Sequence, residues 1–201
     1  MGTTARCFAS ISSFRRNSEF GIRRAGETGS EDFNVPSDPD FDPVPLLEAL
    51  TGKGVDFVVI GGIAGGIHGS VYSTQDLDIA YARDRPNLER LASALRELGA
   101  VLRGAPPGLP FQLDAKGLES GSHFTFATPH GSLDILSDPD GAPPYRVLKA
   151  QGRLAMIGDQ RVTAASLDHL IAMKEAAGRP KDTLMATEYR TLSNELRAPE
   201  G

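Results

Sequence analysis

Apolar positions recur along the chain with two different periods, which predict a mixture of strands and helices from residue 42 onward. Leu88, Leu91 and Leu95 lie at helical spacing, whereas 56–60 and 76–81 are short apolar runs typical of buried strands. The pattern predicts strands at 56–60, 76–81, 101–102, 123–128, 132–136, 154–157 and 161–164. It predicts helices from 43 to Gly52 or Gly54, at 63–67, 87–98, 145–151 and 167–177, and through 185–196. The stretch 104–121 is rich in Gly and Pro and is predicted to be mostly a long loop near the functional site.

Local end signals support these helices. Asp42 followed by Pro43 is an N-cap with proline at the first helical position, and Ser166 is a second N-cap. Gly99 and Gly178 follow the apolar stripes of two helices, where glycine commonly ends a helix. The elements therefore have defined starts and stops as well as periodicity.

The first part of the chain has a different composition. Residues 1–41 are rich in Ser, Arg, Gly and Asp without apolar periodicity, so we expect a disordered N-terminal extension, with an organelle transit peptide or an overlong start as alternatives. The 201 residues then predict one domain at 42–197, with a core at 55–140 and a hairpin and helices at 144–197.

Bulk composition narrows the functional class. The apolar fraction of 40% is enough for a core, and no apolar run approaches the about 20 residues of a membrane span, so a soluble protein without a membrane partner is expected. A net charge of -5 indicates no general polyanion-binding surface. Cys7 is the single cysteine, which excludes an internal disulfide and a cysteine zinc cluster and favours a cytoplasmic setting.

Asp76 and Asp78 are the first candidate functional residues. Residues i and i+2 of a strand lie on one face about 6.5 Å apart, so both carboxylates would point together. Two such charges repel, and one would take up a proton unless a cation joined them. Because Mg²⁺ prefers carboxylate, water and phosphate oxygens, the pair predicts a metal-dependent phosphoryl or nucleotidyl chemistry.

Lys174 is the second candidate. It falls at the i+7 position of the apolar stripe of helix 167–177, where a lysine needs an anion beside it or must lose its proton. Structural alternatives stay open for each candidate: Lys174 extending to solvent, the aspartates as surface acids, and Gly61 with Gly62 as a plain turn. The histidines share no metal-ligand spacing and are expected to be structural.

Two other glycine or aspartate motifs fit less well. The glycines at 61–66 do not match G-x-G-x-x-G, and no G-x-x-x-x-G-K-[ST] is present. The D-x-D of haloacid dehalogenase-like phosphatases closes an apolar strand, whereas Asp76 opens one. A phosphohydrolase is therefore a weaker hypothesis.

The order of motifs resembles the nucleotidyltransferase superfamily, the polymerase-β-like fold. A strand is followed by Gly61-Gly62, a short helix, Asp76 and Asp78, and then a third acid, Asp134, on a neighbouring strand. Runs at His68-Gly69, at 74–79 (TQDLDI) and at 170–182 (LIAMKEAAGRPKD) are similar to those of small AbiEii-type nucleotidyltransferases of toxin-antitoxin systems. The resemblance implies an α/β (α+β) nucleotidyltransferase fold, a mixed twisted β-sheet flanked by helices, with a C-terminal helical segment.

The resemblance also implies roles for particular residues. Asp76 and Asp78 would hold Mg²⁺, or Mn²⁺ in its place, on the nucleoside triphosphate. Asp134 with that pair would hold a second ion and orient the attacking hydroxyl. Nucleotide binding would involve Gly61, Gly62, Thr74, Lys174, Arg179 and Lys181. Lys174 would act with the three aspartates in catalysis by neutralising the leaving pyrophosphate.

The implied function is transfer of a nucleotide from a nucleoside triphosphate to an RNA (tRNA) or protein hydroxyl, as the toxin of a toxin-antitoxin system with an antitoxin partner. The sequence departs from the pattern of this family at two places, and these differences support an alternative function. Many members carry an arginine where this chain has 70–73 (SVYS), and an acid where it has Met185. The alternative is a catalytically degenerate relative that acts as a binding or regulatory partner.

Overall fold

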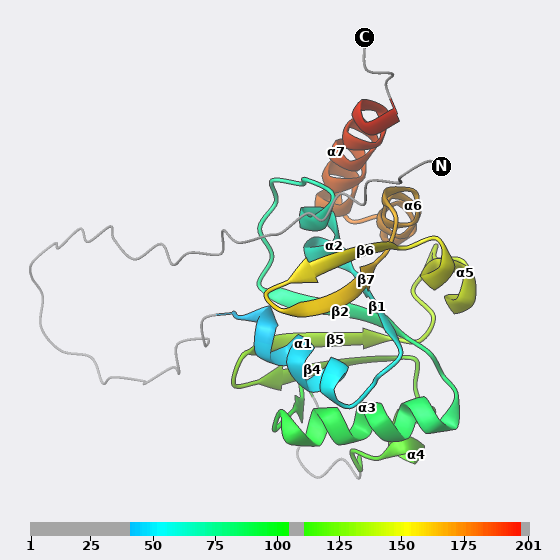
Figure 1. Cartoon of the computed structure of the whole chain (residues 1–201). Helices are drawn as coiled ribbons and strands as arrows, with labels where there is room; N and C mark the ends of the chain where they lie inside the picture. The colour runs from blue at the N-terminus through cyan, green and yellow to red at the C-terminus, as the bar shows by residue number, and fades with distance from the viewer. Residues whose placement is uncertain (1–40, 105–110, 198–201) are drawn as a thin grey trace, which may run out of the picture.

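The computed structural model describes residues 41–104 and 111–197, so the predicted disordered extension lies, except for Phe41, outside the described residues. Helices and strands alternate from α1 to β4, and two hairpins and a pair of helices follow (Figure 1). The helices are α1 (Pro43–Gly52), α2 (Gly61–Ile67), α3 (Arg85–Glu97), α4 (Ala115–Glu119), α5 (Tyr145–Ala150), α6 (Leu167–Ala177) and α7 (Pro180–Arg197). The strands are β1 (Phe57–Ile60), β2 (Asp76–Tyr81), β3 (Val101–Leu102), β4 (His123–Thr128), β5 (Gly131–Leu136), β6 (Arg153–Ile157) and β7 (Gln160–Ala164).

The strands form one sheet in the order β3-β4-β5-β2-β1-β7-β6. β2 lies in the middle, antiparallel to β1 and parallel to β5, and β1 pairs with β7 in parallel. The sheet is therefore mixed, with helices against it and α6 and α7 at the C-terminus, which confirms the predicted α/β architecture.

The two faces of the sheet carry different side chains. Leu77 and Ile79 of β2 are fully buried on the face toward α1 and α3. Asp76 and Asp78 alternate with them and therefore lie on the opposite face, where α2 packs on β1 and β2. Figure 1 shows α3 and α4 along one side of the sheet and α2, α6 and α7 on the other.

The helix ends use the predicted caps. Asp42 Oδ1 accepts a hydrogen bond from the Val44 amide at 3.0 Å at the start of α1, and Ser166 caps α6. Gly178 ends α6 in the left-handed conformation, with φ of 63°, a value that favours glycine. This turn allows α7 to fold back along α6, so the two helices pack as a pair.

Within the stretch 104–121, which was predicted to be mostly a loop near the functional site, 105–110 lie outside the described residues and the prediction was wrong for 115–119. These residues form α4, capped by Asp114, whose Oδ1 accepts from the Gly117 amide at 2.7 Å. α4 packs against α3, on the face of the sheet away from Asp76 and Asp78. Five residues with a central glycine give too short a period to predict a helix. Among the described residues, no helix combines the length and apolarity that crossing a membrane requires.

Candidate active site

Three carboxylates from two strands meet on one face of the sheet. The parallel pairing of β2 with β5 places Asp78 beside Asp134 and Asp76 beside Ser132. Asp76, Asp78 and Asp134 each offer one oxygen, and these oxygens lie within 4.8 Å of one another. The structure thus brings together the three acids that the sequence singled out from positions up to 58 residues apart.

The electrostatics of this carboxylate cluster (Asp76, Asp78 and Asp134) indicate a deficit of positive charge. Burial, reinforced by the neighbouring Asp76 and Asp134, raises the pKa of Asp78 to about 7. Burial also raises the pKa of Asp134, whose Oδ1 is buried without a hydrogen-bond partner among the described residues. A cation bound by all three groups would remove the repulsion and satisfy this oxygen. Three converging carboxylate oxygens suit a hard divalent ion, so the cluster could hold one.

Gly61 lets the start of α2 approach the cluster closely. Its φ is 63°, and a Cβ atom built there would lie 1.9 Å from Asp78 Oδ2. A side chain at 61 would therefore displace the carboxylate as well as strain the backbone. At Gly62 a Cβ would lie 2.6 Å from the Cβ of Thr74, whose hydroxyl donates a hydrogen bond to Asp76. The glycine pair thus seats α2 directly over β2, and Thr74 orients one carboxylate.

Lys174 has the anion that its place on the apolar stripe requires. Its Nζ lies 2.9 Å from Oδ1 of Asp182, and the Nε of Arg179 lies 2.5 Å from Oδ2 of the same carboxylate. The Asp182 side chain is only 2% exposed, so both cations share one buried partner. Burial alone would raise the pKa of Asp182, but hydrogen bonds from Arg179 and Lys174 hold it below its usual range.

This ion cluster faces the carboxylates. The charges of Lys174 and Arg179 both act on Asp78, where they oppose the rise in its pKa. Lys174 is largely buried, whereas the Arg179 side chain is 75% exposed at the start of α7. The two cations therefore lie at the side of the site formed by the α6–α7 pair.

Thr74 and Lys181, two of the predicted nucleotide-binding residues, differ in their place relative to the carboxylate cluster. Thr74 lies in the site through Asp76, but Lys181 is exposed and forms no hydrogen bond or ion pair within residues 41–104 and 111–197. Asp182 was not among the predicted site residues, although it ends the R-P-K-D run and the lysine on the apolar stripe called for an acid. The pattern gave the need for an anion but not its position.

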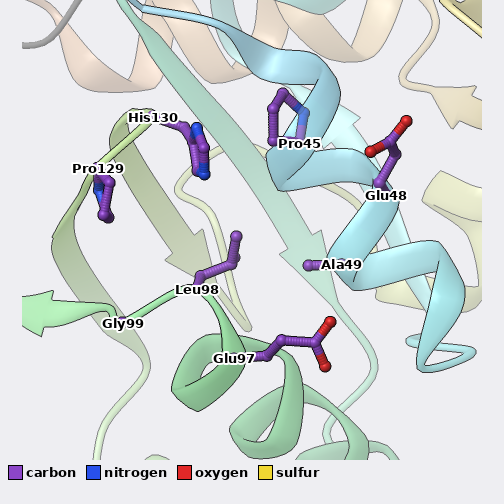
Figure 2. A pocket seen from close by; sticks show the side chains of 8 residues that line it. All are labelled: Pro45, Glu48, Ala49, Glu97, Leu98, Gly99, Pro129 and His130. Carbon is purple, nitrogen blue, oxygen red and sulfur yellow. The ribbon is translucent and has the colours of Figure 1, made fainter.

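One surface depression lies away from the carboxylate cluster. Its volume is about 450 Å³, and it is formed by α1, the end of α3 and the turn between β4 and β5. Figure 2 shows Glu48 and Glu97 on its walls and His130 pointing toward α1. Glu97 already pairs with Lys53 at 2.6 Å, and the group of acids among the described residues that could hold a metal is the carboxylate cluster on the opposite face. The candidate chemistry therefore does not lie in this depression.

Comparison with known proteins shows the fold. No family model and no curated protein match the chain. The crystal structure of the lincosamide antibiotic adenylyltransferase LnuA with lincomycin bound matches with a TM-score of 0.52 and 13% identity, over 76% of this chain and 99% of that one. The solution structure of the antibiotic-resistance factor ANT(2'')-Ia matches with a TM-score of 0.49 and 18% identity, over 76% and 81%. An antigenic nucleotidyltransferase-like protein from Paracoccidioides brasiliensis matches with a TM-score of 0.46 and 15% identity, over 78% of each chain. The chain has the nucleotidyltransferase fold that the resemblance implied.

Proposed function

We propose that this protein is a Mg²⁺-dependent nucleotidyltransferase that moves a nucleotide from a nucleoside triphosphate to a hydroxyl of RNA or protein. The observation that carries the proposal is the meeting of Asp76, Asp78 and Asp134 on one face of the sheet, with the pKa of Asp78 raised to about 7. Acids with strongly raised pKa values at a shared position are typical of functional sites.

Asp76, Asp78 and Asp134 would hold the metal. When bound, Mg²⁺ or Mn²⁺ supplies positive charge to the polyphosphate and favours ionisation of the attacking hydroxyl. Thr74 holds Asp76 through its hydroxyl, so that one carboxylate enters the site already oriented. Asp134, with its unpartnered buried oxygen, is the acid on the side away from α2, where an acceptor hydroxyl would approach.

Lys174 and Arg179 would bind the phosphates that leave. Both act electrostatically on Asp78, and both are held by Asp182, which fixes them before a ligand arrives. The backbone of Gly61 and Gly62 adds the start of α2 next to Asp78, where amides would face phosphate oxygens. Positive groups fixed where charge develops stabilise a transition state without reorganisation.

The proposed reaction is a displacement at the α-phosphorus. The acceptor oxygen forms a bond to that phosphorus, the bond to the β-phosphate oxygen breaks, and pyrophosphate leaves. The hydroxyl proton passes to a carboxylate of the cluster or to water. Lys174 and Arg179 would offset the negative charge that collects on the pyrophosphate.

The resemblance at 170–182 supports a finer proposal, namely the toxin of an AbiEii-type toxin-antitoxin system, working in the cytoplasm with an antitoxin partner. Expression in a bacterial host tests this part. Growth should stop with the wild-type chain and continue with Asp76→Asn, and unchanged growth with both would remove the toxin role.

Transfer itself is tested by incubating the protein with Mg²⁺, α-labelled triphosphates, total cellular RNA and a protein lysate. We expect label in RNA or protein, released pyrophosphate, and neither product with Asp78→Asn or with EDTA. Binding of triphosphate without transfer would select the degenerate binding partner instead. Release of free phosphate would select a phosphohydrolase.

A further inference from the structure

The carboxylate cluster borders a part of the sheet that is open to solvent. Thr125 of β4 pairs directly with Asp134, and Val101 of β3 pairs with Ala127, so all four lie on the same face. Val101 is 67% exposed, and Ala127 and His123 are also exposed. A ligand can therefore reach Asp134 across β4 and β3, from the side opposite α2.

Arg103 extends over this open face toward the cluster. Its backbone amide donates to the Thr125 carbonyl at 2.8 Å, and its Nη1 donates to Ser132 Oγ at 2.8 Å. Ser132 lies on β5 and pairs in register with Asp76. The Arg103 side chain thus crosses β4 and brings its guanidinium beside the acids.

The contacts of Arg103 distinguish it from a structural ion-pair residue. It is exposed, and within the described residues it forms no ion pair; its guanidinium is held by a neutral hydroxyl instead. That bond uses one of five N–H donors. Arg103 and His123 also act on Asp134 as positive charges that oppose its raised pKa. A planar cation seated on a hydroxyl beside a metal-binding cluster is suited to grip a phosphate.

We propose that Arg103, held by Ser132 and accompanied by His123, binds a phosphate group on the open side of the carboxylate cluster. This phosphate site rests on the proposed nucleotidyl transfer. It adds to that proposal the chemical group that binds on the side of the carboxylate cluster opposite α2. The phosphate belongs either to the nucleoside triphosphate or to an RNA acceptor, and these two sources share the same recognition.

The test uses two binding measurements on the full chain. Calorimetry measures the binding of each common ribonucleoside triphosphate in the presence of Mg²⁺. Fluorescence anisotropy measures the binding of a short fluorescein-labelled single-stranded RNA. The variants are Arg103→Ala, Arg103→Lys and Ser132→Ala, and Arg146→Ala on α5 is the control because it removes an exposed arginine away from the cluster. Circular dichroism checks that each variant folds.

Arg103→Ala removes a charge-assisted contact and should lower the affinity for the affected ligand by about 10-fold or more. The loss of affinity should be smaller in Arg103→Lys and Ser132→Ala, and absent in Arg146→Ala. A loss confined to RNA assigns the phosphate to the acceptor, and a loss confined to triphosphate assigns it to the nucleotide. If the wild type binds triphosphate and Arg103→Ala weakens neither ligand, the inference is overturned while the proposed function stands. If the wild type binds no triphosphate, both fall.

Discussion

The pKa of Asp78 makes metal binding depend on pH in a defined window. With a pKa of about 7, Asp78 is ionised in about one tenth of molecules at pH 6 and about nine tenths at pH 8. A divalent ion needs the ionised form, so its affinity should rise about 10-fold between these pH values, with release of about one proton on binding at pH 6 and almost none at pH 8.

The same pKa has a consequence for stability without metal. Because the folded-state pKa of Asp78 lies above its ordinary value of 3.8, ionisation destabilises the fold, and stability falls as pH rises from about 4 through about 7. The upper limit of this loss is about 4 kcal/mol. Asp78→Asn removes the titrating group, so in EDTA its melting temperature should change less than that of the wild type over this range.

Calorimetric titration with Mn²⁺ at pH 6 and pH 8, in buffers of different ionisation enthalpy, measures affinity and proton release together. Asp78→Asn should bind weakly at both pH values and release fewer protons than the wild type at pH 6. Equal wild-type affinity at both pH values, or Asp78→Asn that keeps wild-type affinity, would show that Asp78 is not the titrating ligand.

Three further predictions follow from single contacts. Gly61→Ala should lower stability by more than about 1 kcal/mol and weaken metal binding, whereas Gly66→Ala in the same helix, where a Cβ meets nothing within 4 Å, should be neutral or stabilising in thermal melts. Asp182→Asn should lower the free energy of unfolding by about 2 to 4 kcal/mol and weaken triphosphate binding, because Lys174 loses its buried partner. Chemical denaturation measures the stability and calorimetry the binding, and an unchanged denaturation midpoint would contradict the prediction. Asn87→Ala should cost about 2 to 4 kcal/mol, since the buried amide bonds two carbonyls and one amide, but should leave metal affinity unchanged.

Local pattern was sufficient for most of the helices and strands and for two of the three acids of the carboxylate cluster. Asp76 and Asp78 share a face because side chains alternate along a strand, and that period can be read directly from the residues. The caps at Asp42 and Ser166 are likewise local, and they set the observed helix starts. These features need no knowledge of the distant chain.

The convergence with Asp134 is not local. It depends on the parallel pairing of β2 with β5, and strand order is set by how seven strands and the helices bury their apolar faces together. Only the resemblance gave the third acid in advance. Arg103 was missed for the same reason, because its place beside Ser132 depends on β3 lying next to β4.

Lys174 illustrates a partial prediction. Its position on an apolar stripe required an anion, but the identity of the anion depended on the left-handed turn at Gly178 that returns α7 along α6. Asp182 then lies opposite Lys174 on the next helix. The sequence predicted that Lys174 needs an anion beside it, and the tertiary fold brings Asp182 to that position.

Electron paramagnetic resonance of Mn²⁺ in the presence of a nucleoside triphosphate tests most directly whether the three acids form one metal centre. We expect the wild type to bind Mn²⁺ and to change its spectrum from that of free Mn²⁺ with triphosphate, and we expect this change to be lost in Asp134→Asn. A wild-type spectrum identical to that of free Mn²⁺ with triphosphate, or an unchanged spectrum in Asp134→Asn, would contradict this expectation.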